Sequence, residues 1–207
     1  MARRNSETGS ARDRLLAAAN ELFYEEGVHT VGIDRVIERA GVAKASLYST
    51  FGSKDELVRA YLAARFETRR RRISQAIARF DDPRDQIMAI YDLLGEIFAE
   101  PEFRGCAFAR ASAEARPDHP ARAVCADSRA WTRALFTDLC RRAGSTRPEE
   151  LARELILLYD GAVMSAQMDR EVAPARAARR VAERLLDAEL GPRSAIAGGQ
   201  VGDLGRA

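Results

Sequence analysis

The chain has 207 residues, of which 46% are hydrophobic and 31% charged, and this balance excludes a disordered, low-complexity protein. Its length is sufficient to bury a sizeable core. The formal net charge is only +2, so composition alone does not indicate a nucleic-acid-binding protein. The charge is unevenly distributed, however. Through residue 72 there are 14 basic and 10 acidic residues, and after it 19 and 21, so the basic excess lies near the N-terminus.

Cysteine usage and hydropathy indicate where the chain functions. Its three cysteines, Cys106, Cys125 and Cys140, are an odd number in a chain too large to depend on disulfides, so we expect free thiols in a reducing compartment. No apolar run approaches the roughly 18 to 20 residues of a membrane span, and the first residues contain no apolar stretch typical of a secretory signal. We therefore expect a cytoplasmic protein with no membrane partner.

Apolar residues recur at spacings of three and four, and no segment shows the alternation typical of strands, so the sequence predicts an all-α fold. Ser10 with Asp13 can cap the first helix, and Ser53 with Glu56 matches a capping box at the start of the fourth. About nine helices are expected. Eight of them span residues 10–26, 33–40, 54–80, 83–99, 106–115, 121–143, 148–168 and 173–190, and a short one between 40 and 54 contains the apolar cluster Leu47, Tyr48 and Phe51 and ends at Gly52. The polar segment 1–10 and the Gly-rich segment 191–207 are predicted to be a disordered arm and tail.

The segment from Ile33 to Leu57 has the spacing of a helix-turn-helix motif: a two-turn helix, a tight turn containing Gly41, and a second short helix. Val42 and Leu47 are expected to pack inward and fix the angle between the helices. The outward residues are then small or basic, which lets the backbone approach a DNA groove, while a phenol and an ammonium can hold phosphate oxygens. The predicted DNA-binding residues are Thr30, Lys44, Ala45, Ser46, Tyr48, Ser49, Thr50 and Lys54.

The stretch from Gly27 to Leu57 resembles the DNA-binding domain of the tetracycline-repressor (TetR) family of bacterial regulators. The resemblance rests on an ordered set of landmarks: Gly27, Ala40-Gly41-Val42, Leu47-Tyr48, Phe51 and Ser53-Lys54. It implies an N-terminal three-helix helix-turn-helix domain, at 11–62, and a larger C-terminal helical domain for ligand binding and dimerisation, at 63–190. It also implies a homodimer that binds a palindromic DNA operator, acts as a repressor by family default and is released by a small-molecule effector. No cofactor or metal is expected.

Several positions depart from the pattern of many family members. Val31 and Gly32 stand where Thr and Ser are common, so phosphate anchoring ahead of the second helix is expected to rest on Thr30 or on backbone amides. Ala43, Ala45 and Thr50 also differ from common family residues. The base preference of the family therefore cannot be carried over to this chain.

The C-terminal part contains two sets of residues with predicted roles. Large adaptable or polar side chains are predicted to line an effector pocket, with Asp160, Gln167 and the Trp131 indole orienting the ligand. The pocket residues are Tyr91, Phe98, Phe103, Cys106, Phe108, Trp131, Tyr159, Asp160, Met164, Gln167 and Met168. Apolar stripes on the last two helices are predicted to form a dimer interface through Leu151, Leu155, Leu158, Ala162, Ala166, Val181, Leu185, Leu186 and Leu190.

Plainer readings of these patterns, and other functions, stay open. The aromatic residues can be ordinary core, and the run Arg69 to Arg72 is expected to be a solvated girdle rather than a second DNA contact. An all-α enzyme is one alternative function, although His29 and His119, expected on the surface, have no metal-ligand spacing. A redox sensor acting through Cys106, and a helical adaptor without DNA contact, are two others.

Overall fold

The computed structural model describes residues 9–192, and this part of the chain contains nine α-helices and no strand. The predicted all-α architecture is therefore confirmed. The helices are α1 (Ala11–Glu26), α2 (Ile33–Ala40), α3 (Lys44–Phe51), α4 (Lys54–Ile77), α5 (Pro83–Phe98), α6 (Ala107–Glu114), α7 (Ala121–Arg142), α8 (Pro148–Asp169) and α9 (Ala173–Leu190). Most of the predicted arm and tail lies outside the described residues.

Local capping explains where the helices begin. The Ser10 hydroxyl accepts a hydrogen bond from the Asp13 backbone N–H at 3.2 Å, and the Asp13 carboxylate accepts one from the Ser10 N–H, which completes a capping box. Ser53 caps α4 by accepting from the Glu56 N–H at 3.1 Å. The Glu56 carboxylate instead binds Arg59, so only half of the predicted box forms there. The fourth helix ends at Ile77 rather than at residue 80.

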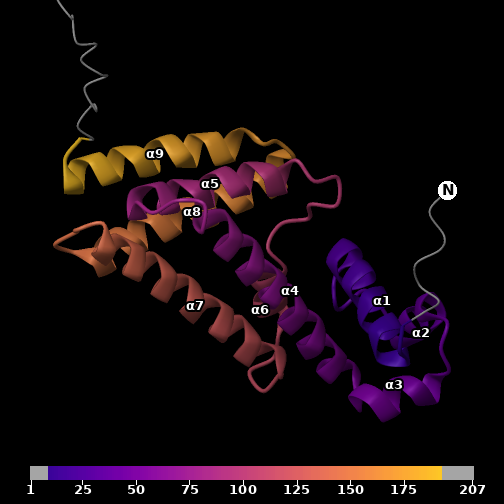
Figure 1. The fold of residues 1–207 in the computed structure, drawn as a ribbon. Helices are drawn as coiled ribbons and strands as arrows, with labels where there is room; N and C mark the ends of the chain where they lie inside the picture. The colour runs from indigo at the N-terminus through magenta and orange to yellow at the C-terminus, as the bar shows by residue number, and fades with distance from the viewer. Residues whose placement is uncertain (1–8, 193–207) are drawn as a thin grey trace, which may run out of the picture.

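The helices form two groups joined by α4. Helices α1 to α3 lie together at one end, and α4 leads from them into a bundle of α5, α7, α8 and α9 (Figure 1). Within the bundle, α8 packs against α7 and α9, and α9 packs against α5. Among helices within the described part of the chain, none is both long and apolar enough to cross a membrane.

Two hydrophobic cores correspond to these groups. The larger core is built from α5, α7, α8 and α9 with Ile73 of α4. The smaller core lies among α1, α2, α3 and the first half of α4, but Ala107 and Ala111 of α6 and Ala121 and Cys125 of α7 also belong to it. The predicted boundary at residue 62 falls inside the unbroken helix α4. The N-terminal group is thus joined to the bundle by packed side chains as well as by the chain itself.

The connection between α7 and α8 is held to the end of α9 by Glu189. Its carboxylate accepts hydrogen bonds from the Ser145 hydroxyl at 2.8 Å and the Thr146 hydroxyl at 3.3 Å, and an ion pair with Arg147 spans 3.0 Å. These donors, Arg147 first, favour the ionised carboxylate and lower the pKa of Glu189 from 4.5 to about 2. The ionised form of Glu189 therefore stabilises the folded chain.

We predict that Glu189→Gln lowers the melting temperature at pH 7 and that this effect disappears in acid. A carboxylate whose pKa is lower in the folded chain contributes stability above its unfolded pKa, and loses that contribution as the pH falls from about 4.5 towards about 2. Melting curves of both proteins over this pH range measure the effect, with Glu154→Gln, an exposed carboxylate on α8, as the control. A difference in melting temperature that persists unchanged at pH 2 would contradict this account.

Candidate DNA-binding surface and effector cavity

The turn between α2 and α3 has the geometry that the sequence predicts. Gly41 adopts the left-handed conformation, with φ 62° and ψ 43°, which a residue with a β-carbon rarely adopts. Its N–H and that of Val42 donate to the last carbonyls of α2, at 3.2 and 3.3 Å. Leu47 of α3 and Val36 of α2 are both 0% exposed. Buried contacts therefore fix α3 against α2 and leave its opposite face free.

The free face of α3 carries three short side chains and two long ones. Lys44, Ala45, Tyr48, Ser49 and Thr50 are exposed, and Tyr48 is 47% exposed, while Ser46 is half-buried. The hydroxyls of Ser49 and Thr50 donate to the Ser46 carbonyl, at 3.2 and 2.6 Å, and so keep oxygen lone pairs as acceptors. A surface of this kind lets the helix approach base edges in a major groove.

Three cationic side chains border this face. The Lys44 ammonium lies 2.9 Å from the Asp34 carboxylate. Lys54 begins α4, where it is half-buried 6.0 Å from the centre of the Phe23 ring, and this burial lowers its pKa. Arg12 was not among the predicted residues; it is exposed near the start of α1, with its guanidinium 5.7 Å from the centre of the Phe51 ring. Since this proximity joins α1 to α3, residue spacing could not reveal it.

The segment ahead of α2 explains one departure from the family pattern. Val31 is 0% exposed and belongs to the small core, so a hydroxyl at this position would be buried rather than presented to DNA. Gly32 is the N-cap of α2 and supplies no side-chain hydrogen bond. Thr30 is exposed just before it, but it does not cap the helix.

A cavity of about 990 Å³ lies where α1 and α4 to α8 meet. This volume is at the upper end of the range usual for small-molecule sites. Its wall includes eight of the eleven residues predicted to line an effector pocket: Phe98, Phe103, Cys106, Phe108, Tyr159, Asp160, Met164 and Gln167. The structure thus brings together residues from two separate stretches of the sequence, 98–108 and 159–167.

The other three predicted pocket residues lie elsewhere. Tyr91 is 1% exposed within the larger core, where its hydroxyl donates to the Leu155 carbonyl at 2.6 Å. Trp131 packs its ring against Phe66, with ring centres 6.0 Å apart, and is not part of the cavity wall. Met168 is 75% exposed on α8. For these three, helical spacing alone did not distinguish core and surface from the cavity wall.

The expectation of a solvated girdle is confirmed for two residues of the arginine run and wrong for the other two. Arg69 and Arg72 line the cavity, whereas Arg70 and Arg71 are exposed. Four successive residues occupy four directions around a helix, so two of them can face inward while the others face solvent. Arg72 binds Glu100 at 2.6 Å, and Arg69 donates a hydrogen bond to the Thr132 hydroxyl.

Tyr24 of α1 ties the N-terminal group to the cavity wall. Its hydroxyl donates to the Gly105 carbonyl at 3.1 Å and accepts from the Arg104 N–H at 3.0 Å, while Arg110 donates to the Tyr24 carbonyl at 2.9 Å. Gly105 itself has a φ of 85°, and a β-carbon there would lie 1.9 Å from Oε1 of Gln167, so the loop packs closely on α8. The wall also includes four α1 residues: Asn20, Glu21, Tyr24 and Glu25.

A second link joins the start of α4 to the connection between α6 and α7. His119, whose side chain is 9% exposed, lies with Nε2 3.5 Å from the Asp55 carboxylate, and its Nδ1 accepts from the Ala121 N–H at 3.0 Å. The expectation of a surface histidine was therefore wrong for His119. The carboxylate that covers it comes from a residue 64 positions earlier, which no local pattern indicates.

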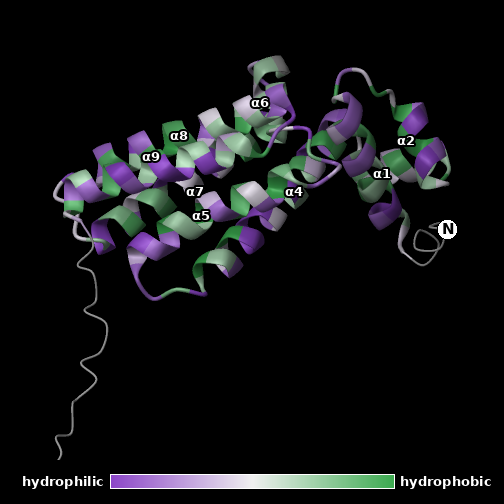
Figure 2. Ribbon diagram, turned by 90° about the horizontal axis from the view of Figure 1, so that it is seen from above, coloured by the Kyte–Doolittle hydropathy of each residue, from purple (hydrophilic) through white to green (hydrophobic). Residues whose placement is uncertain are grey.

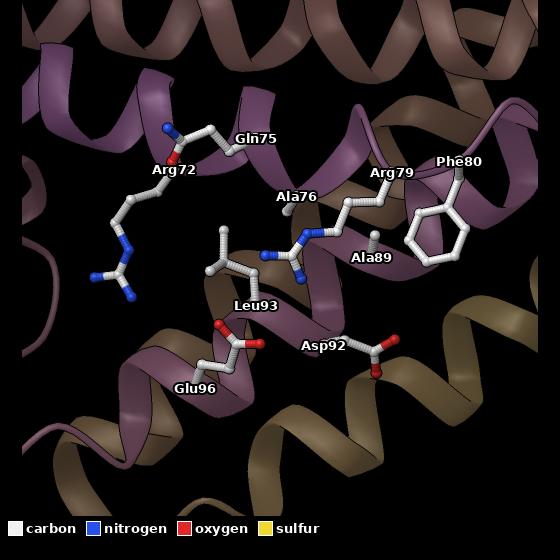
Figure 3. A pocket seen from close by; sticks show the side chains of 9 residues that line it. All are labelled: Arg72, Gln75, Ala76, Arg79, Phe80, Ala89, Asp92, Leu93 and Glu96. Atoms are coloured by element: carbon white, nitrogen blue, oxygen red, sulfur yellow. The ribbon is translucent and has the colours of Figure 1, made fainter.

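A smaller hollow of about 320 Å³ lies between α4 and α5 (Figure 3). Arg79 extends into it from the turn after α4, and Asp92 and Glu96 extend from α5. Arg72 and Leu93 line both this hollow and the large cavity. With charged groups on both sides and little apolar wall, the hollow is less suited to an organic ligand.

Most residues predicted to form the dimer interface are instead buried inside one protomer. Leu151, Leu155, Ala162, Ala166 and Leu186 are at most 5% exposed and belong to the larger core. The half-buried residues Leu158, Leu185 and Leu190 pack against that core. Only Val181 of the predicted set is clearly exposed, at 40%. The prediction selected the stripes that face the protomer's own bundle.

Exposed apolar side chains lie on another face of the same helices. Leu157, Met164 and Met168 are 64%, 50% and 75% exposed, and their spacings of seven and four place them on one face of α8. Val181 is exposed on α9, which lies beside α8 (Figure 2). Contiguous exposed apolar residues mark interaction surfaces.

The cysteines are free, as expected, in the described part of the chain. Burial raises the pKa of Cys125 and brings that of Cys140 to about 12, which disfavours their thiolates. Cys106 is half-buried in the cavity wall, where its sulfur accepts from the Ala109 N–H at the start of α6. Residues 9–192 contain no group of three or more side chains able to hold a metal ion.

The fold and the exposed recognition helix define a helix-turn-helix DNA-binding transcription regulator. A family model described as "Bacterial regulatory proteins, tetR family" matches residues 15–61. SCO4454, a TetR-family transcriptional regulator from Streptomyces coelicolor, has a solved structure that is 31% identical, with a TM-score of 0.82 over 87% of this chain and 96% of that one. The chain belongs to the TetR family.

Two curated relatives extend this comparison. The chain is 23% identical to the transcriptional regulator LmrA of Bacillus subtilis over 80% of its own length and 91% of that protein. It is 35% identical over 94 residues to the transcriptional activator FasR of Mycolicibacterium smegmatis. This second match spans 45% of the chain and 42% of FasR.

We predict that Lys44→Ala weakens DNA binding through the loss of one phosphate contact. The slope of log K against log salt should become shallower by about 0.9, and affinity should fall about fivefold in 0.15 M salt. Fluorescence anisotropy with labelled DNA at several salt concentrations measures both quantities. Arg142→Ala, which removes one positive charge from the far end of α7, is the control. An unchanged slope would show that Lys44 does not contact phosphate.

Proposed function

We propose that the chain is a ligand-responsive repressor that binds a palindromic operator as a homodimer and is released by a small-molecule effector bound in the large cavity. The observation that carries this proposal is that α1 of the DNA-binding end forms part of the cavity wall. A molecule in the cavity therefore contacts both the reading head and the bundle. The cavity is proposed as a binding site and not as a site of turnover.

The contacts of Tyr24 support a route from the cavity to DNA. A ligand that displaces the loop around Gly105 changes the hydrogen bonds that this loop makes with the Tyr24 hydroxyl. Since α1 packs against α2 and α3, a shift of α1 changes the position of the recognition helix. Linkage requires the converse effect, so operator DNA weakens ligand affinity by the same factor.

We propose repression, rather than activation, because repression is the usual action of TetR-family regulators. FasR is named an activator, and its match covers less than half of each protein. Transcription of a reporter gene behind the operator, with and without the protein, distinguishes repression from activation.

We predict that purified protein selects a palindrome from a random pool of double-stranded DNA. Two identical recognition helices related by a two-fold axis read identical half-sites about one helical turn, roughly 34 to 36 Å, apart. Sequencing of the bound fraction identifies the site, and unselected DNA is the control. Enrichment of a single, non-repeated half-site would argue against the dimer, and no enrichment would argue against sequence-specific binding.

We predict that Leu157→Asp converts the dimer into a monomer and abolishes tight operator binding. A carboxylate on the exposed apolar face of α8, present twice in a symmetric interface, should raise the dimer Kd by about 100-fold or more. Analytical ultracentrifugation measures the assembly, and circular dichroism checks that the variant folds. Phe80→Asp, which changes an exposed apolar residue in the connection between α4 and α5, is the control and should stay dimeric. If the Leu157→Asp variant stays dimeric, the dimer interface does not include this face of α8.

A further inference from the structure

We propose that the large cavity recognises an organic anion, a molecule with a carboxylate or similar acid group on an apolar body, and that Arg69 binds the acid group. This inference rests on the proposed function of the cavity as the effector site. It adds the chemical class of the ligand and the residue that selects for its charge.

The partners of the arginines in the cavity wall distinguish Arg69 from the others. Arg72 is paired with Glu100 at 2.6 Å, and Arg129 with Asp160 at 2.5 Å, so both already have carboxylate partners. Arg69, half-buried in the wall, donates to the neutral Thr132 hydroxyl. Its Nε is buried and, among the described residues, has no hydrogen-bond partner. A half-buried guanidinium that lines the cavity without a carboxylate partner favours an incoming acceptor of negative charge.

The remaining cavity arginines are held in other ways. Arg65 donates to the Asn20 side-chain oxygen at 3.0 Å and stacks on the Tyr24 ring, 3.5 Å from its centre. Arg104 is exposed and donates to the backbone carbonyls of Pro101 and Phe103. Neither has a buried nitrogen without a partner, so Arg69 is the better candidate for a ligand contact.

Two hydroxyl groups, those of Tyr159 and Thr132, support the binding of an acid group beside Arg69. Tyr159 is 8% exposed and lines the same cavity, and burial raises its pKa, so its phenol stays protonated and can donate a hydrogen bond. The Thr132 hydroxyl donates to the Ser128 carbonyl at 2.9 Å, which leaves its lone pairs to hold the guanidinium in place. An arginine and a phenol in the wall of one cavity supply the kinds of donor that a carboxylate accepts.

The rest of the wall selects the body of the ligand. The apolar and aromatic residues that line it include Ile73, Leu94, Ile97, Phe98, Phe103 and Phe108. A small inorganic anion would leave most of the volume of about 990 Å³ unfilled. A cationic amphiphile would place its charge near Arg69 without a free carboxylate partner there. An acid with a large apolar body satisfies both parts of the wall.

A purely structural role for Arg69 makes a different prediction. Its guanidinium lies 5.4 Å from the centre of the Phe108 ring and 5.9 Å from that of Trp131, so it also contributes packing. If packing were its whole role, replacing it would change stability but would not change the preference among ligands of different charge.

The test uses three probes with the same ten-carbon chain: decanoate, decan-1-ol and decyltrimethylammonium, each below the concentration at which it aggregates. Isothermal titration calorimetry with the full chain gives the affinity of each. The variants are Arg69→Gln, which removes the charge, and Arg69→Lys, which retains it. Arg70→Gln, at the exposed neighbouring position, is the matched control. Melting curves check that each variant folds.

We expect the wild-type chain to bind decanoate about tenfold or more tightly than either other probe. Arg69→Gln should remove this preference, Arg69→Lys should keep most of it, and Arg70→Gln should keep all of it. If Arg69→Gln fails to fold, the wild-type preference and its retention in Arg69→Lys decide the question.

Two other results overturn the inference in distinguishable ways. The anion inference is refuted if the alcohol or the ammonium binds as tightly as decanoate or more tightly. It is also refuted if Arg69→Gln leaves decanoate binding unchanged. In both cases the cavity is still a ligand-binding site, as the proposed function requires. Absence of binding by all three probes contradicts the anion inference and the ligand response together, and selection of an operator would still support the DNA-binding part of the proposed function.

Discussion

Helix α4 runs unbroken from Lys54 to Ile77 and contributes side chains to both hydrophobic cores. Leu57, Val58, Tyr61 and Leu62 hold its first half against α1, and Ile73 holds its second half in the bundle. A rigid helix shared by two cores cannot tilt at one end without moving the other. The position of the recognition helix therefore depends on how the bundle packs around α4.

The large cavity lies between the elements whose packing around α4 sets the position of the recognition helix. Its wall combines α4 with α1 on one side and with α6, α7 and α8 on the other, so its occupant contacts elements from both cores. Tyr24 adds a direct bond to the cavity loop, and the contact of His119 with Asp55 adds a second link at the start of α4. Under the proposed function, a ligand that binds one packing of these elements more tightly than another would be coupled to DNA binding through these links.

Burial also decides which apolar faces can meet a partner. Both α8 and α9 have buried apolar residues on the face that packs inside the bundle and exposed apolar residues on another face. Leu155 and Leu157 are two positions apart, yet one is 0% and the other 64% exposed. The periodicity of leucines shows that a helix is amphipathic, but it does not say whether a given stripe faces the same chain or a second copy.

The sequence by itself determined the all-α fold, the helix boundaries to within a few residues and the helix-turn-helix motif, because capping residues, glycine turns and apolar periodicity act over a few positions along the chain. Only the tertiary structure decided that Arg12 lies beside α3, that Arg69 and Arg72 face the cavity while Arg70 and Arg71 do not, and that His119 is covered by Asp55. These outcomes depend on contacts between residues tens of positions apart, and on the rotation of each helix about its own axis. Neither is encoded in local spacing, since the packing of all neighbours together sets them.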